Sequence, residues 1–392
     1  MHPIVKLLPG RHKRLKSGHP WIFSNEVAKG DGAPIDPGAT VTIVGDNGET
    51  YGTALYNPHS LVAGRLIDRS ADVDLDTVFF SDRIARAVAL RDRLFAEPYY
   101  RLIHAEADGL PGLIVDRYGD TVVIQCNVAG MDVRRDAILD ALDRAVSPNR
   151  VILRNDSRGR VQEGLPLEVA TLRGNDEEPV VLRENGATFA VHPAQGQKTG
   201  WFFDQRQNRA FVAALARGGR LIDFYSYGGG FSIQALKSGA TEAVMVDRSA
   251  SAMAVAADAA SLNGVAEGCR FVKQDSFDEM ERLSREGERF DVVVADPPAF
   301  VKSKKDARRG SRAYRKMTRL AARLVAPGGI LFVASCSHNV APDLFADLVK
   351  QGLGDAGRSG RILRSAGAGP DHPVHHALPE TAYLKSLTLQ LD

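Results

Sequence analysis

The sequence predicts an open, mostly parallel α/β domain that follows a small β-rich module and a mixed α+β middle segment. From about Leu221 onward, strand-like runs alternate with helix-like runs, as far as the run GGILFVASC. Alternation of this kind is typical of a parallel sheet with crossover helices. Residues 4 to 67 instead hold short apolar runs separated by Gly, Pro, Asn and Asp, which is typical of an all-β module.

Changes of pattern divide the chain into three predicted domains, residues 1–73, 74–185 and 186–392. After Asp74 the spacing predicts a helix whose apolar face holds Val78, Phe79, Ile84, Val88, Leu90 and Leu94 and whose other face holds Arg83, Arg86, Arg91 and Arg93. The run GLIVDRYGDTVVIQCNV predicts a hairpin turning at residues 118–120, and MDVRRDAILDALDRAV predicts a helix. The C-terminal tail holds two further strand candidates around a Pro/His-rich loop.

Composition indicates a folded, cytoplasmic protein. The 392 residues are 44% hydrophobic, which suffices for two or three cores. Three cysteines without CxxC spacing argue against both a disulfide framework and a structural zinc site, and we expect no metal. The N-terminal apolar stretch is interrupted by Lys6 and Pro9, and no later run has membrane-spanning length, so we expect neither export nor a membrane partner.

Positive charge is concentrated in two segments of a chain whose net charge is +2. Residues 1–30 hold six Lys and Arg against one acidic residue, and residues 301–320 hold nine against one. Two basic clusters on a nearly neutral chain favour a polyanionic partner, in particular a nucleic acid. The alternative for either cluster is a solvated charged surface.

Polar side chains follow five predicted strands, and they are Tyr225, Asp247, Asp275, Asp296 and Cys336. In open parallel sheets, ligands bind at the carboxyl ends of the strands. We therefore expect these five residues to surround one ligand site.

The turn DFYSYGGGF predicts a site for a nucleotide-like cofactor, because its glycines allow close backbone approach at the start of a helix. It does not match the dinucleotide fingerprint, whose third glycine would stand at Ile233, and the chain has no GxxxxGK[ST] motif. Asp247 is positioned to accept hydrogen bonds from ribose hydroxyls. Its alternative role, helix N-cap, can instead be filled by Ser249.

The turn DPPAF and the run ASCS predict a carboxylate beside a thiol nucleophile. Two prolines stiffen the turn after Asp296, whose carboxyl group could hydrogen-bond or protonate N3 of a cytosine. Cys336 could then add to carbon 6 of that ring, which makes carbon 5 nucleophilic enough to be methylated. Cys126 and Cys269 have the patterns of structural cysteines, and His338 is not assigned as a base.

Seven strings in order, GHPWIFSNEV, EADGLPGLIVDRYGD, GQKTGWFFDQRQNR, DFYSYGGGF, DPPAF, SCS and DHPVHHALPETAYLKS, resemble the RlmI-type class I S-adenosylmethionine-dependent ribosomal RNA methyltransferases. The resemblance runs from about residue 4 to the end. It implies a PUA domain, a middle domain, a Rossmann-like catalytic domain, and methylation of carbon 5 of a cytosine in large-subunit ribosomal RNA. The family usually has Thr where this chain has Gly228, so this chain lacks one hydroxyl contact with the cofactor that the resemblance would otherwise imply.

The resemblance also implies an S-adenosylmethionine site. Phe224, Ser226, Gly228 and Gly230 are expected near the methionine part, Asp247 at the ribose and Asp275 at the adenine. The remaining residues expected around the cofactor are Arg248, Ser276, Asp296, Lys198, Asp204 and Arg206. Trp201 and Phe203 next to them either contact a ligand or close the core.

The expected RNA contacts lie in the two basic segments. After the DPP turn they are Lys302, Lys304, Lys305, Arg308, Arg309 and Arg312, which could hold phosphates, with Tyr314 as a candidate to stack on a base. In the N-terminal module they are Lys13, Arg14, Lys16 and Trp21.

Two other functions stay open. The chain could be a purine-directed ribosomal RNA methyltransferase of the same fold, since DPP turns also hold exocyclic amines, or a non-catalytic RNA-binding ribosome-assembly factor. The nucleotide modified, the form of the substrate RNA and the base that removes the carbon 5 proton are not predicted, and a homodimer is an open alternative to a monomer.

Overall fold

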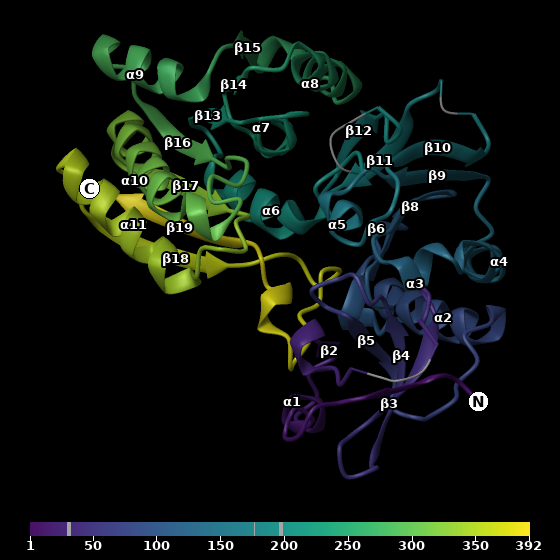
Figure 1. The fold of residues 1–392 in the computed structure, drawn as a ribbon. Helices are drawn as coiled ribbons and strands as arrows, with labels where there is room; N and C mark the ends of the chain where they lie inside the picture. The colour runs from purple at the N-terminus through teal and green to yellow at the C-terminus, as the bar shows by residue number, and fades with distance from the viewer. Residues whose placement is uncertain (30–32, 176, 196–198) are drawn as a thin grey trace. The chain divides into compact units, whose positions relative to one another are not determined.

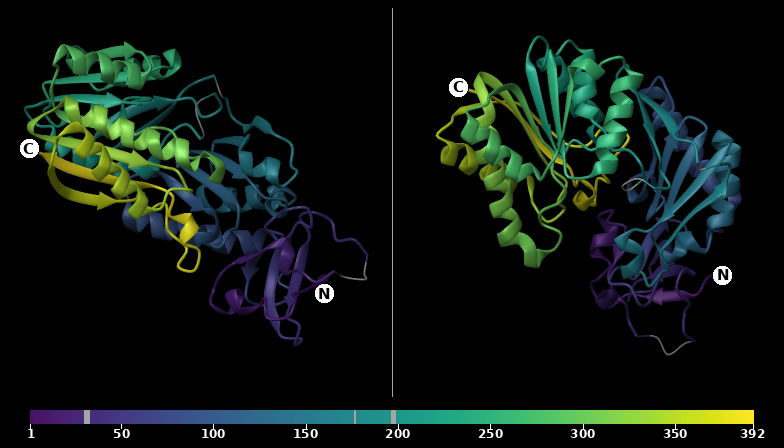
Figure 2. Two further views of the ribbon diagram at one scale, coloured as in Figure 1. Left: turned by 60° about the vertical axis from the view of Figure 1, so that its left-hand side comes forward. Right: turned by 90° about the horizontal axis from the view of Figure 1, so that it is seen from above.

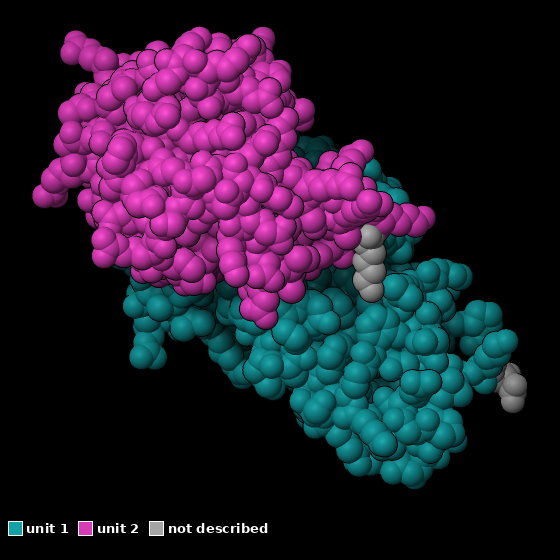
Figure 3. Space-filling view, turned by 90° about the vertical axis from the view of Figure 1, so that its left-hand side faces the viewer, with its two compact units in different colours: residues 1–180, 191–203, 370–381 teal, residues 181–190, 204–369, 382–392 magenta. Residues whose placement is uncertain are grey.

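The structure, a computed structural model, describes residues 1–29, 33–175, 177–195 and 199–392. Contacts within the chain divide it into two compact units (Figure 3). Unit 1 consists of residues 1–180, 191–203 and 370–381, and unit 2 of residues 181–190, 204–369 and 382–392. The C-terminal part of the chain therefore contributes to both units.

The N-terminal part of unit 1 is a five-stranded sheet in the order β1-β3-β4-β5-β2 (Figure 1). Its elements are β1 Ile4–Lys6, α1 Lys13–Lys16, β2 Trp21–Ile22, η1 Ser24–Glu26, β3 Thr40–Val44, β4 Thr50–Tyr56 and β5 Gly64–Asp68. Val41 and Ile43 alternate with threonines along β3 and are fully buried. The all-β prediction for this segment is confirmed.

The second part of unit 1 is a five-stranded sheet in the order β10-β9-β8-β7-β6. Its strands are β6 Tyr99–His104, β7 Leu113–Tyr118, β8 Thr121–Cys126, β9 Arg150–Asn155 and β10 Glu168–Arg173, and its helices are η2 Ala105–Asp108, α2 Thr77–Leu94, α3 Ala129–Asp132, α4 Arg135–Val146 and α5 Arg158–Gln162. Tyr118 pairs with Thr121 across the β7–β8 turn, as predicted. The single helix expected over MDVRRDAILDALDRAV is instead two, α3 and α4.

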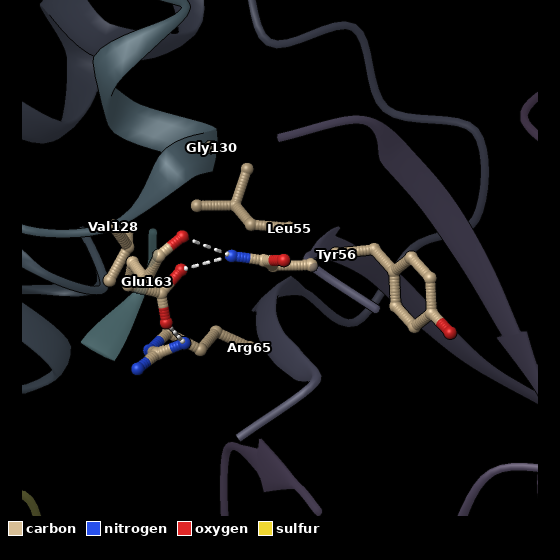
Figure 4. A pocket seen from close by; sticks show the side chains of 7 residues that line it. Leu55, Tyr56, Arg65, Val128, Gly130 and Glu163 are labelled. Carbon is tan, nitrogen blue, oxygen red and sulfur yellow. Dashed lines mark hydrogen bonds and ion pairs between the residues drawn. The ribbon is translucent and has the colours of Figure 1, made fainter. Parts of the chain in front are cut away.

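Buried polar contacts connect the two parts of unit 1. The carboxylate of Glu163 accepts hydrogen bonds from Asn57 Nδ2 at 3.0 Å and Ser60 Oγ at 2.7 Å, and it pairs with Arg65 at 3.0 Å. Figure 4 shows Glu163 and Arg65 among the side chains that line a small pocket here. Because the polar groups there satisfy one another, we assign this pocket a structural role.

Unit 2 contains a seven-stranded sheet in the order β15-β14-β13-β16-β17-β19-β18 (Figure 1). Its strands are β13 Arg220–Phe224, β14 Glu242–Asp247, β15 Cys269–Lys273, β16 Phe290–Ala295, β17 Val325–Ser335, β18 Gly360–Ala366 and β19 Lys385–Leu391. The first five are mutually parallel, and β19 runs antiparallel to both β17 and β18. The predicted parallel sheet is confirmed, with one antiparallel strand added.

Helices cover both faces of this sheet, as the views in Figure 2 show. One face packs on α9 Ser276–Glu286, α10 Ala307–Leu324 and α11 Pro342–Ala356, and the other on α6 Arg206–Leu215 and α7 Gly230–Lys237, with α8 Ala250–Leu262 beside α7. A hairpin of β11 Val180–Glu184 and β12 Ala187–Val191 precedes this sheet, and short helices lie at η3 Phe203–Gln205, η4 Ala266–Gly268, η5 Lys304–Asp306 and η6 Pro379–Thr381.

The prediction of which α2 residues lie on the buried face of the helix is wrong in part. Val78, Leu90 and Leu94 are exposed, whereas Arg91, expected on the polar face, is completely buried. Its guanidinium forms two hydrogen bonds with the Asp108 carboxylate, at 2.6 and 2.8 Å. A paired arginine can be buried where an unpaired one could not, and helical spacing does not reveal the partner.

We expect Arg91→Met to lower the free energy of unfolding of unit 1 by about 3–5 kcal/mol, because it leaves Asp108 buried without its counterion. Urea denaturation followed by tryptophan fluorescence measures this, since Trp21 and Trp201 both lie in unit 1. Arg93→Met is the matched control, because Arg93 is exposed on the same helix; it should change the free energy by no more than about 0.5 kcal/mol. Equal effects of the two substitutions would contradict the prediction.

Candidate active site

The loop after β13 is held in an uncommon backbone conformation. Tyr225, Tyr227 and Gly229 have φ values of 63°, 47° and 73°. Left-handed φ values at non-glycine residues are energetically costly and concentrate at functional sites. At Gly229, an added Cβ would lie 2.8 Å from Met245 Sδ, so a larger residue would have to displace that side chain and would also be strained by the positive φ. This loop ends at Gly229, the N-cap of α7.

Asp223, the residue before Phe224 in β13, lies beneath this loop. It is 1% exposed, and its carboxyl group accepts a hydrogen bond from Ser232 Oγ at 3.1 Å. The pKa of Asp223 is raised to about 8, mainly by burial and in smaller part by the negative charges of Asp296 and Asp247, against the lowering effect of the hydrogen bonds with Ser232. Asp223 therefore carries a proton at neutral pH in the folded protein.

The carboxylates at or just after the ends of β14 and β15, those of Asp247 and Asp275, accept hydrogen bonds from backbone amides. Asp247 accepts hydrogen bonds from the amides of Tyr227 at 3.1 Å and Ser249 at 2.9 Å, so it fixes the β13 loop. Ser249, not Asp247, caps α8, as the sequence suggested. Asp275 caps α9 through Oδ1, which accepts from the amides of Phe277 and Asp278.

The DPP turn begins directly after β16. Gln205 Nε2 donates to Asp296 Oδ2 at 2.9 Å, and Asn208 Nδ2 holds that Gln205 side chain through a 2.7 Å hydrogen bond to its oxygen. Phe300, the last residue of DPPAF, packs its ring 4.8 Å from that of Tyr314. The turn is thus fixed by a polar contact at one end and an aromatic contact at the other.

The Ser335–Ser337 segment is attached to the same turn through Tyr314. The Tyr314 hydroxyl lies 2.8 Å from the hydroxyls of both Ser335 and Ser337, and the amide of Val301 donates to Ser337 Oγ at 3.3 Å. Because alternate residues of an extended segment point to opposite sides, the serines point to Tyr314 and Cys336 points away. Cys336 Sγ lies 4.0 Å from the Pro297 carbonyl oxygen, so the thiol borders the DPP turn.

The predicted base-stacking role of Tyr314 is wrong. Its side chain has 0% exposure, packed under the DPP turn, so it cannot stack on RNA. Its ring and hydroxyl instead hold the two turns together. Sequence alone did not indicate this role because the burial of a tyrosine within a basic segment depends on tertiary packing.

The other basic residues near the DPP turn are exposed. Among the described residues, Lys302, Lys305, Arg308, Arg309 and Arg312 form no ion pair, and the side chain of Lys304 lies outside what the structure describes. The three arginines lie in the first turns of α10, where a loop was predicted. Further along the helix, Arg315 pairs with Asp355 and Lys316 with Glu281.

The N-terminal candidates for RNA binding are mostly engaged inside unit 1. Arg14 pairs with Glu26 at 2.8 Å, Lys16 with Glu49 at 2.8 Å, and the Trp21 indole donates to Glu106 at 2.8 Å. Lys13 is exposed. The half-buried Trp21 ring and the exposed lysines still leave a surface for a ligand there.

The predictions for residues 198–206 agree with the structure only in part. Lys198 lies outside the described residues. Trp201 and Phe203 are buried, which agrees with the core alternative for these aromatics. The Asp204 carboxylate accepts a hydrogen bond from Tyr383, and Arg206 lies 3.5 Å from Glu184.

A residue that the sequence analysis missed is Lys385, at the start of β19. Its ammonium is buried and donates to the carbonyl oxygens of Ser337 and Val340 at 2.6 and 2.7 Å. The sequence feature that could have identified it is a lysine at the start of an apolar strand, in the run YLKSLTLQL.

Two family models match the chain: one for S-adenosylmethionine-dependent methyltransferases at residues 158–356 and one for a PUA-like domain at residues 5–69. The chain is 38% identical over 397 residues to ribosomal RNA large subunit methyltransferase I of Aeromonas salmonicida, covering 100% of both chains. It is 35% identical over 392 residues to the protein of the same name from Shewanella denitrificans, covering 99% of both. The chain belongs to this methyltransferase family.

Solved structures agree with this methyltransferase in fold. A SAM-dependent methyltransferase from Streptococcus mutans superposes with a TM-score of 0.84 at 23% identity, covering 99% of this chain and 100% of that one. A methyltransferase complexed with SAH has a TM-score of 0.85 at 23% identity and 99% coverage of both chains. The predicted Rossmann-like fold, PUA-like module and use of S-adenosylmethionine are confirmed.

The residues of the methyltransferase site fit this cofactor. Ser226 Oγ is buried and has no hydrogen-bond partner among the described residues, so a ligand atom could satisfy it. Gly228 and Gly230 are buried at or just before the start of α7, and neither carries a Cβ that would separate the backbone from a ligand. The Phe224 side chain is fully buried in the core, so a contact from that residue would use its backbone. Ser276 is buried and Arg248 exposed.

The described parts of this methyltransferase hold neither a candidate metal site nor a candidate membrane-spanning helix. They contain no group of three or more His, Cys, Asp or Glu side chains that could hold a metal ion. Within them, no helix has the length and apolar character needed to cross a bilayer.

We expect Asp223→Asn to remove a pH dependence of stability. The carboxyl group keeps its proton up to a pKa of about 8 when folded, against a value of 3.8 for an ordinary aspartate, so the unfolded state releases a proton between these values. Wild-type stability should therefore fall with rising pH in this range, by at most about 1.4 kcal/mol per unit from this group.

Urea unfolding between about pH 5 and pH 8, followed by circular dichroism, measures this slope. The stability of Asp223→Asn relative to wild type should increase with pH. Asp258→Asn, at an exposed position on α8, should leave the wild-type slope unchanged. Identical slopes for Asp223→Asn and wild type would show that Asp223 is ionised in the folded state.

Proposed function

We propose that this enzyme methylates carbon 5 of a cytosine in large-subunit ribosomal RNA through a temporary bond between Cys336 and carbon 6. The relatives named above are ribosomal RNA large subunit methyltransferases, which supports RNA as the substrate. The observation that carries the proposal is the position of Cys336 Sγ, 4.0 Å from the Pro297 carbonyl oxygen of the DPP turn.

The chemistry requires a nucleophile, because carbon 5 of cytosine reacts poorly until carbon 6 is substituted. In the proposed cycle the Cys336 thiolate adds to carbon 6 while Asp296 hydrogen-bonds or protonates N3 and so withdraws electrons from the ring. The cofactor, when bound, supplies an electrophilic methyl group. A base then removes the carbon 5 proton, and the sulfur leaves from carbon 6 as the ring regains its double bond.

We assign the cofactor to the carboxyl edge of β13, β14 and β15. Ser226 and the backbone of Gly228 and Gly230 would contact its methionine part, Asp247 its ribose and Asp275 its adenine. For Asp275 the capping bonds both use Oδ1, which is compatible with a further contact through Oδ2. The remaining proposed contacts are Phe224, Arg248, Ser276, Asp296, Lys198, Asp204 and Arg206.

We assign RNA binding to the exposed cations at the start of α10 and to the PUA-like module. Lysine and arginine side chains without internal partners can neutralise phosphates without breaking existing ion pairs. We also propose the division into domains at residues 1–73, 74–185 and 186–392. The PUA-like match ends at residue 69, which supports the first boundary, whereas the second boundary falls within the hairpin of β11 and β12.

RNA carrying 5-fluorocytidine should trap the enzyme, because fluorine at carbon 5 cannot be removed as a proton and the thiol cannot then be eliminated. We expect a cofactor-dependent covalent adduct with wild type and none with Cys336→Ala, which should also lose methyl transfer. Denaturing electrophoresis and mass spectrometry measure the adduct on the 5-fluorocytidine RNA. Methyl transfer is measured separately, on ribosomal RNA from a strain lacking the gene.

Cys269→Ala is the matched control, since Cys269 is another partly exposed cysteine of unit 2, and it should retain the adduct. An adduct that persists in Cys336→Ala would exclude this mechanism. Methyl transfer that persists in Cys336→Ala, with no adduct in wild type, would indicate a purine-directed enzyme instead. Failure of wild type to bind S-adenosylmethionine by calorimetry would indicate an assembly factor.

Replacing Arg308, Arg309 and Arg312 by Gln should weaken RNA binding and flatten its salt dependence. If all three contact phosphates, the slope of log K against log salt should decrease in magnitude by about 2 to 3. Filter binding at several salt concentrations measures the slope. Arg315→Gln is the control, because Arg315 lies on the same helix but is paired with Asp355; it should leave the slope nearly unchanged. An unchanged slope in the triple variant would remove α10 from the RNA interface.

A further inference from the structure

Lys385 occupies a position where a lysine is costly. The residue is 8% exposed, at the start of a strand whose following residues pack in the core of unit 2. Burying an ammonium group is unfavourable unless it is hydrogen-bonded or paired with a negative charge. Two of its three protons are used in the bonds to the carbonyl oxygens of Ser337, at 2.6 Å, and Val340, at 2.7 Å.

The register of the sheet brings Lys385 beside the backbone that flanks Cys336. In the antiparallel pairing of β17 with β19, Lys385 stands opposite Ser335, the residue before the cysteine. Its ammonium binds the carbonyl of Ser337, the residue after the cysteine. The ammonium is therefore bonded to the residue after Cys336, and the backbone of Lys385 pairs with the residue before it.

The charges of the two groups are coupled. Burial lowers the pKa of Lys385 to about 8, and a negative charge on Cys336 opposes this effect by raising it. Such coupling is reciprocal. If a Cys336 thiolate stabilises the protonated form of Lys385, the Lys385 ammonium stabilises the thiolate by the same free energy. At neutral pH the lysine is still mostly protonated, so its charge is present when a thiolate forms.

Three other titratable side chains lie around this segment, namely Tyr314, His338 and Asp296. Tyr314 binds Ser335 and Ser337 through a neutral hydroxyl, and burial raises its pKa. His338 packs its ring 5.4 Å from that of Tyr383, whose hydroxyl is directed to Asp204. Asp296 is an acid, bound by Gln205, and would oppose a thiolate.

We propose that Lys385 is a positioning residue that fixes the Ser337–Val340 backbone and stabilises the thiolate of Cys336. The inference rests on the proposed nucleophilic role of that cysteine. When the thiolate forms, the thiol proton passes to solvent and the sulfur keeps the electron pair that later bonds to carbon 6. The ammonium keeps all three of its protons throughout, so it acts by charge and by its two hydrogen bonds. Since the thiolate is the reactive form, this increases the fraction of enzyme able to attack.

The test is the pH dependence of Cys336 alkylation by iodoacetamide in the full-length protein without RNA, with each cysteine followed by mass spectrometry. In Lys385→Met the half-maximal rate should move to higher pH by about one unit, which is about a tenfold loss of thiolate at a pH below both midpoints. Lys385→Arg, which keeps the charge, should restore most of the wild-type profile. Cys269, which is partly exposed, serves as the internal control, and its profile should not move.

A second measurement leaves Lys385 in place and so avoids any effect of that substitution on folding. NMR of protein labelled at the lysine Cε carbons should show one lysine whose pKa is lower in Cys336→Ala than in wild type, because the thiolate that favours the ammonium is gone. Lysine titrations that are identical in the two proteins would overturn the inference, as would a Cys336 alkylation profile unaffected by Lys385→Met.

These outcomes are distinct from a failure of the proposed function. Methyl transfer that survives Cys336→Ala would refute the nucleophilic role, whatever the alkylation profiles show. Alkylation profiles that do not respond to Lys385, in an enzyme inactivated by Cys336→Ala, would refute the role of the lysine and leave the covalent mechanism intact.

Discussion

The hydroxyl group of Tyr314 is the contact on which the candidate active site depends. Strands β16 and β17 bring the DPP turn and the Ser335–Ser337 segment to one edge of the sheet, but pairing within a sheet does not fix how the loops beyond it meet. The Tyr314 hydroxyl, bonded to both serines and 3.4 Å from the Phe300 amide, supplies that constraint from α10. A buried hydroxyl left without a partner costs about 1–3 kcal/mol, so the arrangement resists separation of the two turns. The thiol is held against the DPP turn as a consequence.

Charge is arranged in two zones of unit 2, and each suits a different ligand. The edge formed by β13, β14 and β16 carries Asp223, Asp247 and Asp296, of which the buried Asp223 holds a proton. The negative charge that remains favours a cation, and the sulfonium of the cofactor is one. The start of α10 carries exposed cations instead, which favour phosphates. Mutual repulsion among the acids is limited because Asp247 accepts two backbone amides and Asp223 is protonated.

Local patterns in the sequence were sufficient for much of this fold, and the failures have a common cause. Alternating strands and helices, the β7–β8 hairpin and the polar strand ends are encoded by neighbouring residues, and all are present in the structure. Arg91, Tyr314 and Lys385 are buried polar residues whose partners are distant in sequence: Asp108, the two serines, and the carbonyls of Ser337 and Val340. Hydrophobic spacing assigns such residues to the surface, because it cannot identify the group that compensates their burial.

The direction of β19 explains why a lysine from the end of the chain can reach the segment that contains Cys336. Residues at the start of a strand parallel to β17 would lie at the opposite edge of the sheet, with the amino ends of the other strands. Because β19 is antiparallel, its first residue lies beside the last residue of β17, as the pairing of Lys385 with Ser335 records. Insertion of this strand between β17 and β18 therefore does more than extend the sheet. It brings a cation to an edge where the parallel strands contribute acids and a thiol, and it buries that cation in the core of the same unit.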